Sequence, residues 1–190
     1  LPYRMQLDLY EDVHVDGSGH ARQEDVALEL RWALADWGKI PLNPTLYAEY
    51  KWVAEGADVF EAKLLLGDQL RGGWHYGLNL VWERELGGEL TNEFQIVGGI
   101  SKTLLDERLS FGVEAKYVNE SVTGNRSDPE QKFLIGPSTQ IRFTNRLHLD
   151  VTTLFGTNNE SQLQEFWFIL GYDFGKSDEH HQLPKTGLRN

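Results

Sequence analysis

Apolar and polar residues alternate with a period of two along most of the chain, and no segment sustains the spacing of an amphipathic helix. A period of two sends successive side chains to opposite faces of a β-strand. The chain is therefore predicted to be all-β. One stretch shows the pattern with large apolar residues at every even position: Trp74, Tyr76, Leu78, Leu80 and Trp82 against His75, Gly77, Asn79, Val81 and Glu83.

Ten segments carry this alternation, and each is about seven to twelve residues long. A strand that crosses a bilayer at the usual tilt needs ~9–11 residues, whereas ordinary strands average ~5–6. Strands of such even length are expected when each one crosses the same slab. We expect about ten strands, within a range of eight to twelve. The alternating segments are 3–9, 26–35, 46–52, 60–67, 74–83, 93–100, 109–117, 132–143, 147–155 and 165–174.

The connections between these segments differ in length in a regular way. Most even-numbered connections, counted from the N-terminus, are short: 68–73, 103–107 and 144–146, with 37–44 as the exception. The odd-numbered ones include the two longest, 14–24 and 119–131, and two of middle size, 85–91 and 156–162. Short turns at one end and longer loops at the other are typical of barrels that span a bilayer. With ten strands, both chain ends fall on the short-turn side.

Composition excludes several classes of protein. The 190 residues carry 18 basic and 29 acidic side chains, for a net charge of −11, so no nucleic-acid partner is expected. No cysteine is present, which excludes a disulfide scaffold and fits export through an oxidising compartment. No apolar run approaches the ~18 residues of a membrane helix. A β-barrel leaves a much weaker signal in each segment and is compatible with this composition.

The alternation alone does not say which face points outward, because a soluble barrel buries its apolar face and a membrane barrel exposes it. Small residues sit on the polar side, as expected for the crowded concave side of a barrel: Gly67, Gly77, Gly99, Gly112, Gly136 and Gly171. Rows as bulky as the one at 166–174 would overpack a small interior. Aromatic residues near strand ends predict an interfacial girdle: Trp32, Trp52, Trp74, Trp82, Tyr117, Phe143 and Tyr172.

The last alternating segment, Phe166-Trp167-Phe168-Ile169-Leu170-Gly171-Tyr172-Asp173-Phe174, is similar to the aromatic final strand of small outer-membrane β-barrels of Gram-negative bacteria. The chain resembles that porin-like family in architecture over residues 3–174. The resemblance implies a closed antiparallel up-and-down transmembrane β-barrel over residues 1–175, in the outer membrane. It further implies contact with membrane lipid and lipopolysaccharide, and with the barrel-assembly machinery during biogenesis. Unlike the family, the chain continues, and residues 176–190 are expected to form a polar periplasmic tail.

The polar faces then form the lumen, where charges of both signs are expected to pair because an unpaired buried charge is costly. About ten strands lie near the size at which side chains fill a barrel. A filled, structural interior is therefore favoured over a narrow aqueous pore, which would prefer cations. The predicted lumen network is Arg4, Asp8, Glu29, Arg31, Glu49, Lys51, Glu61, Lys63, His75, Glu83, Glu93, Glu114, Lys116, Arg142, His148, Asp150, Glu165 and Asp173.

Two other functions remain open at this stage. The first is a barrel enzyme acting on lipid or peptide at the outer rim, for which His14, His20 and the His148/Asp150 pair are weak candidates. The second is a soluble β-barrel that binds a hydrophobic ligand. No residue is assigned a catalytic role, and no metal site or cofactor is predicted, so a non-enzymatic protein is favoured. The sequence also leaves open a role as one subunit of a larger membrane complex.

Overall fold

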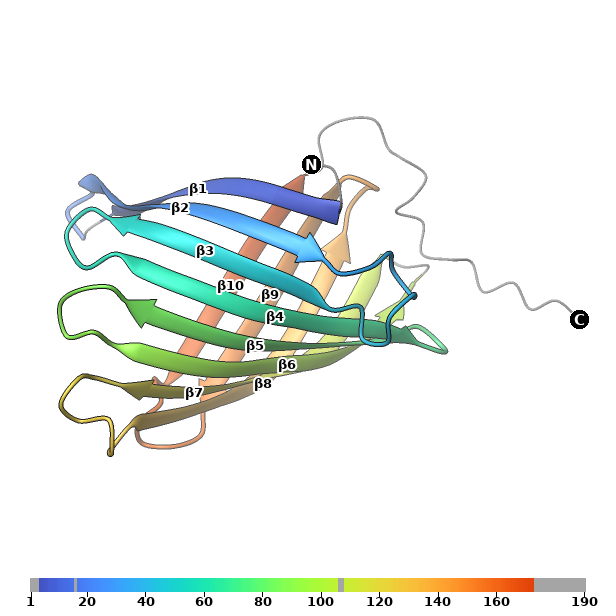
Figure 1. The fold of residues 1–190 in the computed structure, drawn as a ribbon. Coiled ribbons are helices and arrows are strands. Elements are labelled where there is room, and N and C mark those ends of the chain that lie inside the picture. Colours follow the sequence, from blue (N-terminus) through green and yellow to red (C-terminus); the bar gives the residue numbers. More distant parts are fainter. Residues whose placement is uncertain (1–3, 16, 106–107, 173–190) are drawn as a thin grey trace, which may run out of the picture.

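The computed structural model describes residues 4–15, 17–105 and 108–172, and these form one curved sheet (Figure 1). Within them, ten strands of 9 to 13 residues follow one another. They are β1 (Met5–Val15), β2 (Ala21–Ala33), β3 (Thr45–Val53), β4 (Val59–Leu70), β5 (Trp74–Glu85), β6 (Asn92–Leu104), β7 (Leu109–Ser121), β8 (Glu130–Arg142), β9 (Leu147–Gly156) and β10 (Gln164–Tyr172).

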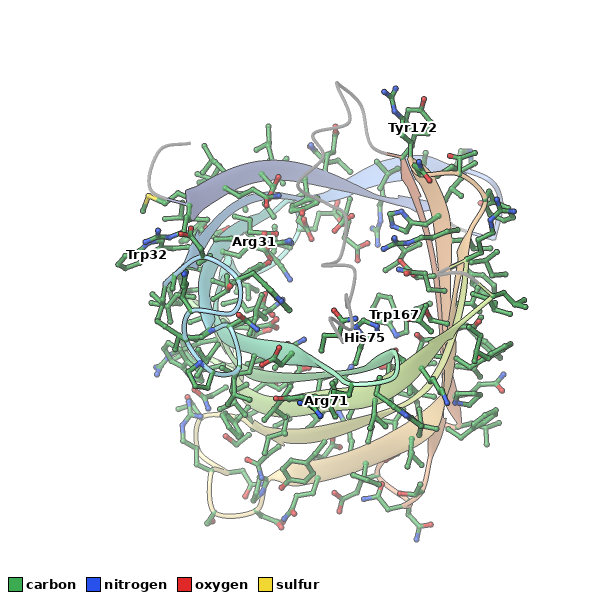
Figure 2. All side chains as sticks on the ribbon, turned by 90° about the vertical axis from the view of Figure 1, so that its right-hand side faces the viewer. Arg31, Trp32, Arg71, His75, Trp167 and Tyr172 are labelled. Carbon is green, nitrogen blue, oxygen red and sulfur yellow. The ribbon has the colours of Figure 1, made fainter. Side chains whose placement is uncertain are left out.

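Every strand pairs antiparallel with its neighbours in sequence, so the sheet order is β1 through β10 without a crossover. This confirms the predicted all-β, up-and-down arrangement. Figure 2 shows the sheet curling around a central space. The backbone pairings of the described residues join consecutive strands and include none between β1 and β10. Among the described residues no helix is long and apolar enough to cross a membrane.

Two predicted loops are too long, because strands extend into them. β1 runs to Val15 and β2 starts at Ala21, so the expected connection at 14–24 is largely hairpin. A bulge lets β2 continue there: Asp12 pairs with Asp25, and Val13 already pairs with Gln23. Likewise, the connection expected at 119–131 is reduced to 122–129 by β7 and β8. Sequence alternation fades in both places, which is why the strands were predicted too short.

The connections still segregate by end. The short-turn end has links at 71–73, 105–108 and 143–146, and again 34–44 is the exception. Gly72 and Gly73 have φ values of 77° and 76°, a backbone region that favours glycine and lets β4 and β5 reverse direction in three residues. The long-loop end holds the connections 16–20, 54–58, 86–91, 122–129 and 157–163.

The two faces of the sheet differ in burial and polarity. Buried side chains, charged ones included, lie on the concave face: Ala27, Glu29, Tyr47, Glu49, Glu61, Val81, Val118, Leu134 and Leu154. Large apolar side chains of the opposite parity are exposed on the convex face, such as Leu30 at 38% and Ile100 at 46%. Figure 2 shows Trp32 pointing away from the interior and its neighbour Arg31 pointing into it.

The β8–β9 pairing is interrupted near its middle, and we call this place the β8–β9 seam. The ladder pairs Leu134 with Gly156 and Ile135 with Phe155, then resumes at Ser138 and Thr152. Pro137 lies in the gap and has no amide hydrogen to donate. Beside it, a Cβ atom on Gly136 would overlap the carbonyl oxygen of Thr153, so the backbone of β9 occupies the space that a side chain would need.

We predict that Gly136→Ala destabilises the fold, because its methyl group would force β8 and β9 apart. Overpacking of this kind costs about 1–3 kcal/mol. Gly77→Ala on the same face is the matched control, since its Cβ would meet nothing closer than the Leu66 carbonyl oxygen at 3.8 Å. Urea unfolding followed by tryptophan fluorescence measures both. Equal stabilities of the two variants would contradict the packing at the seam.

Candidate functional site on the concave face

A row of carboxylates crosses the concave face of the sheet, with one from each of eight consecutive strands. Each member lies directly opposite the next in the backbone register. Like charges in such positions repel one another and destabilise a sheet unless other groups compensate. We refer to this set as the carboxylate row: Asp8, Glu29, Glu49, Glu61, Glu83, Glu93, Glu120 and Glu130.

Three members of the row are buried, and each has a cation two residues further along its own strand. Glu29, Glu49 and Glu61 are 1%, 6% and 5% exposed. Their ion-pair partners are Arg31 for Glu29, Lys51 for Glu49 at 3.3 Å, and Lys63 for Glu61 at 2.6 Å. Residues two apart on a strand share a face, so the Glu-x-Lys/Arg spacing supplies each pairing locally. The pairing offsets the large desolvation cost of these charges.

Tyr47 fills the space between two of these cations. It lies directly opposite Arg31 on β2 and Lys63 on β4. The Lys63 Nζ is 4.3 Å from the ring centroid, and the Arg31 guanidinium carbon is 5.7 Å from it, both within the range of cation–π attraction. The Tyr47 hydroxyl donates a hydrogen bond of 2.5 Å to Glu49. Tyr47 thus ties three neighbouring ion pairs into one packed cluster on β2–β4.

Towards the long-loop end, members of the row have partners on neighbouring strands as well as on their own. Lys51 Nζ lies 3.9 Å from Glu83, and Gln95 donates to Glu93. Lys132 contacts Glu120 at 2.7 Å and Glu130 at 3.0 Å. A further ion pair joins Lys116 of β7 to Glu165 of β10 at 3.0 Å.

The concave face of β5–β9 is hollow where that of β2–β4 is filled. A cavity of about 490 Å³ lies there, and we call it the polar cavity. Much of its wall consists of small or uncharged polar residues, with three charged side chains among them. Its lining includes His75, Gly77, Asn79, Gly99, Ser101, Thr103, Ser110, Gly112, Glu114, Ser138, Thr139, Gln140, Arg142, Asp150 and Thr152.

The histidines of this region have polar contacts that do not assemble a catalytic triad. His75 Nε2 is 3.0 Å from the Thr103 hydroxyl, which is 3.2 Å from the Ser110 hydroxyl. His148 Nε2 is 3.5 Å from Asp150. None of the contacts found among the described residues links His148 to a serine or threonine hydroxyl. The described residues also contain no group of three or more His, Asp or Glu side chains that could hold a metal ion.

The concave face gathers most of the lumen residues that the alternation indicated, with two exceptions. Arg4 precedes β1 and contacts Asp36 at 3.4 Å near the short-turn end, apart from the buried cluster. Asp173 lies outside the described residues, as do Phe174 and the tail at 176–190. The side chain of His14 is likewise not described.

The predicted lumen network left out several residues of this face, among them two carboxylates and two aromatic residues. Glu120 and Glu130 were assigned to a loop, although both extend the carboxylate row. Tyr47 and Trp167 were not counted because they are aromatic residues on the polar side of their strands. Strict parity was the available signal: Tyr47 alternates in step with Glu49, and Trp167 with Glu165.

Comparison with known proteins identifies no relative. No protein-family model matches the chain, and a search of curated proteins finds no match. The site therefore has to be interpreted from its own geometry.

We predict that Tyr47→Phe lowers the free energy of unfolding by about 1.5–3 kcal/mol, the usual range for a hydrogen bond to a charged group. The variant keeps the ring between Arg31 and Lys63 but leaves Glu49 without its hydroxyl donor. Tyr117→Phe is the control, because it removes an exposed hydrogen bond of 3.1 Å to Gln131 and is expected to cost less than about 1 kcal/mol. Equal losses in urea titrations of the two variants would argue against the buried cluster.

Proposed function

We propose that this chain is a transmembrane β-barrel of a bacterial outer membrane, closed through β1 and β10, with a narrow cation-preferring lumen. The observation that carries the proposal is the reversal of the two faces. Large apolar side chains are exposed on the convex face, while three carboxylates, each paired with a cation, are buried on the concave one. A β-protein in water is expected to do the opposite.

The convex face would be unfavourable in water. Exposed apolar patches on soluble proteins rarely exceed a few hundred Å². Here the exposed residues continue across many strands, for example Leu28 and Leu30 on β2, Ile96 and Ile100 on β6, and Ile135 on β8. In a hydrocarbon slab the same face needs no cover, but an open sheet edge there would leave backbone groups without partners. Closure of β1 against β10 is therefore part of the proposal.

The distribution of aromatic residues supports the same orientation. Trp52 and Trp82 lie near the long-loop end of the convex face, and Trp32 and Trp74 near the short-turn end. Aliphatic residues fill the band between them, such as Leu78 and Leu80 between the two tryptophans of β5. Interfacial tryptophans flanking an aliphatic band are typical of membrane barrels. On this model Phe143 and Tyr172 belong to the inner girdle and Tyr117 to the outer one.

The concave face supports a restricted path rather than an open channel. The packed cluster around Tyr47 occupies the β2–β4 side, and the polar cavity leaves room for water on the β5–β9 side. The carboxylate row contributes eight acids to this face, and the remaining strands, β9 and β10, each add at least one more. Acidic residues therefore outnumber basic ones on the concave face. A lumen with excess negative charge attracts cations and repels anions.

The proposal also specifies where in the cell the protein works. Its natural environment is membrane lipid and lipopolysaccharide, with the short turns on the periplasmic side and insertion by the barrel-assembly machinery. The chain then works as a structural or narrow pore-forming protein, alone or within a larger membrane complex. A soluble barrel that binds a hydrophobic ligand is less well supported, because three buried carboxylates lie among the buried apolar residues of the concave face.

A charge placed on each face in turn tests the orientation. We predict that Ile96→Arg lowers stability in detergent micelles or lipid vesicles by about 2–4 kcal/mol, the cost of arginine near the bilayer midplane. Gln95→Arg, one residue away on the concave face, is the control. It is expected to be tolerated because its guanidinium can replace the amide that donates to Glu93. Stability is measured by urea titration and by the heat-dependent shift in gel mobility.

A tolerated charge at position 96 would contradict the membrane proposal. An exposed substitution on a water-facing surface is usually worth within about 0.5 kcal/mol. If Ile96→Arg is harmless, and the protein stays monodisperse in buffer without detergent, the membrane proposal is wrong.

Conductance tests the lumen. We predict that the full chain in planar bilayers gives small currents that favour K⁺ over Cl⁻. Glu83→Gln together with Glu93→Gln should lower that permeability ratio by roughly twofold, because both groups are only half-buried on the concave face. Glu11→Gln, at an exposed position on the convex face of β1, should leave the ratio unchanged. Absence of current at every voltage would leave a filled, purely structural barrel.

A further inference from the structure

The polar cavity has the dimensions of a ligand site. Its volume of about 490 Å³ falls within the ~300–1,000 Å³ typical of small-molecule pockets. Glycines create much of this space, since Gly77, Gly99 and Gly112 all line it. A Cβ atom on Gly112 would lie 2.8 Å from the Ser138 hydroxyl, so a larger residue at this position would crowd the cavity wall.

The chemistry of the wall suits a neutral solute with many hydroxyl groups. Asn79, Ser101, Ser138, Gln140 and Thr152 can each donate and accept hydrogen bonds, as hydroxyl groups of a ligand also do. A charged ligand would instead call for an excess of one opposite charge. The charged residues of the wall include both signs, because Arg142 lines the cavity together with Glu114 and Asp150.

One backbone row connects this wall to an aromatic ring. From β5 to β10 the register places His75, Ser101, Gly112, Ser138, Thr152 and Trp167 directly opposite one another in turn. The four central residues are small, while the two at the ends are rings. Figure 2 shows Trp167 and His75 pointing into the space that the sheet encloses.

Trp167 differs from the girdle tryptophans in the face it occupies. It lies on the concave side, beside Thr152 of the cavity wall, and is 51% exposed there. Its indole N–H donates a hydrogen bond of 3.4 Å to Glu165 at the edge of the ring. Trp167 is not itself part of the cavity lining, but an exposed aromatic ring next to a polar wall offers a flat apolar surface to a partner that is itself amphipathic. A pyranose ring is such a partner, with C–H groups on its faces and hydroxyl groups around its edge.

We propose that the polar cavity binds a neutral sugar of one or two rings, held between Trp167 and the hydroxyl and amide groups of β5–β9. This inference rests on the proposed function, since it names the class of solute that the lumen would accept. The sugar ring stacks on Trp167, and its hydroxyl groups bond to the row of Ser101, Ser138 and Thr152. Glu114, which already accepts a hydrogen bond of 3.2 Å from Thr152, would orient that hydroxyl group.

Binding of glucose and sucrose to the full chain in detergent micelles tests the inference without requiring any pore. Isothermal titration calorimetry gives the dissociation constants. Gly77→Leu should block binding by projecting an isobutyl group into the cavity; Cβ at this position meets nothing closer than 3.8 Å, so the backbone need not shift. Trp167→Ala should weaken binding at least about tenfold, and Trp167→Phe should restore part of it.

Matched controls separate binding from folding. Ala62→Leu adds similar bulk to the convex face, and Trp37→Ala removes an exposed tryptophan from the β2–β3 connection. Both should bind sugar as the unmodified chain does, within about twofold. Every variant is first shown to fold by its heat-dependent gel mobility.

The outcomes of this experiment and of the conductance experiment are independent. If the protein carries no current but binds sugar, and Gly77→Leu loses that binding, the sugar site is supported and the pore is contradicted. If the protein conducts ions but binds neither sugar, the sugar site is wrong and the pore remains supported. The same conclusion follows if the Gly77→Leu variant binds sugar as well as the unmodified chain does. Sodium gluconate provides the last arm: tighter binding of this anion than of glucose would show that Arg142 recognises charge, and would overturn the neutral class of ligand.

Discussion

Electrostatic repulsion along the carboxylate row is the constraint to which the rest of the molecule is adjusted. Eight acids face one another across consecutive strands at the spacing of backbone pairing, where like charges destabilise a sheet. The cations that compensate them are in the flanking rows of the same face, as with Lys51 on one side and Lys63 on the other. A slip of one residue in any strand would turn its carboxylate onto the apolar face and its apolar residues inward. The ionic cluster therefore fixes the register as strongly as the apolar face does.

Much of this arrangement could be predicted from local alternation. The strand count, the antiparallel meander and the partition of Glu49 and Lys51 from Leu46 and Trp52 all follow from a period of two. The first and last residues of the strands could not be predicted in this way. Alternation fades near a bulge, such as that at Asp12 and Val13, and at strand ends composed of polar residues. Glu120 was missed for this reason: a strand end composed of polar residues looks like a loop.

Contacts between strands could not be predicted from the alternation, for a different reason. The spacing of Glu29 from Arg31 is visible in the sequence, but the position of Tyr47 between Arg31 and Lys63 depends on how three strands are staggered. That stagger depends on turn geometry and bulges, which a single sequence does not specify. The cavity has the same origin. Its small residues are far apart in the chain and meet only because the register aligns Ser101, Gly112 and Ser138.

The β8–β9 seam divides the sheet in a way that affects the interior. On one side are eight strands that carry the three buried carboxylates of the described residues; on the other is the β9–β10 hairpin with Trp167. Two polar contacts that cross from β7 to this hairpin are the Lys116–Glu165 ion pair and the Thr152–Glu114 hydrogen bond. An outward shift of the hairpin would break these two and leave the Tyr47 cluster intact. Neither contact involves a buried carboxylate, so substitutions that loosen the hairpin and substitutions that loosen the charged cluster act on separate parts of the concave face.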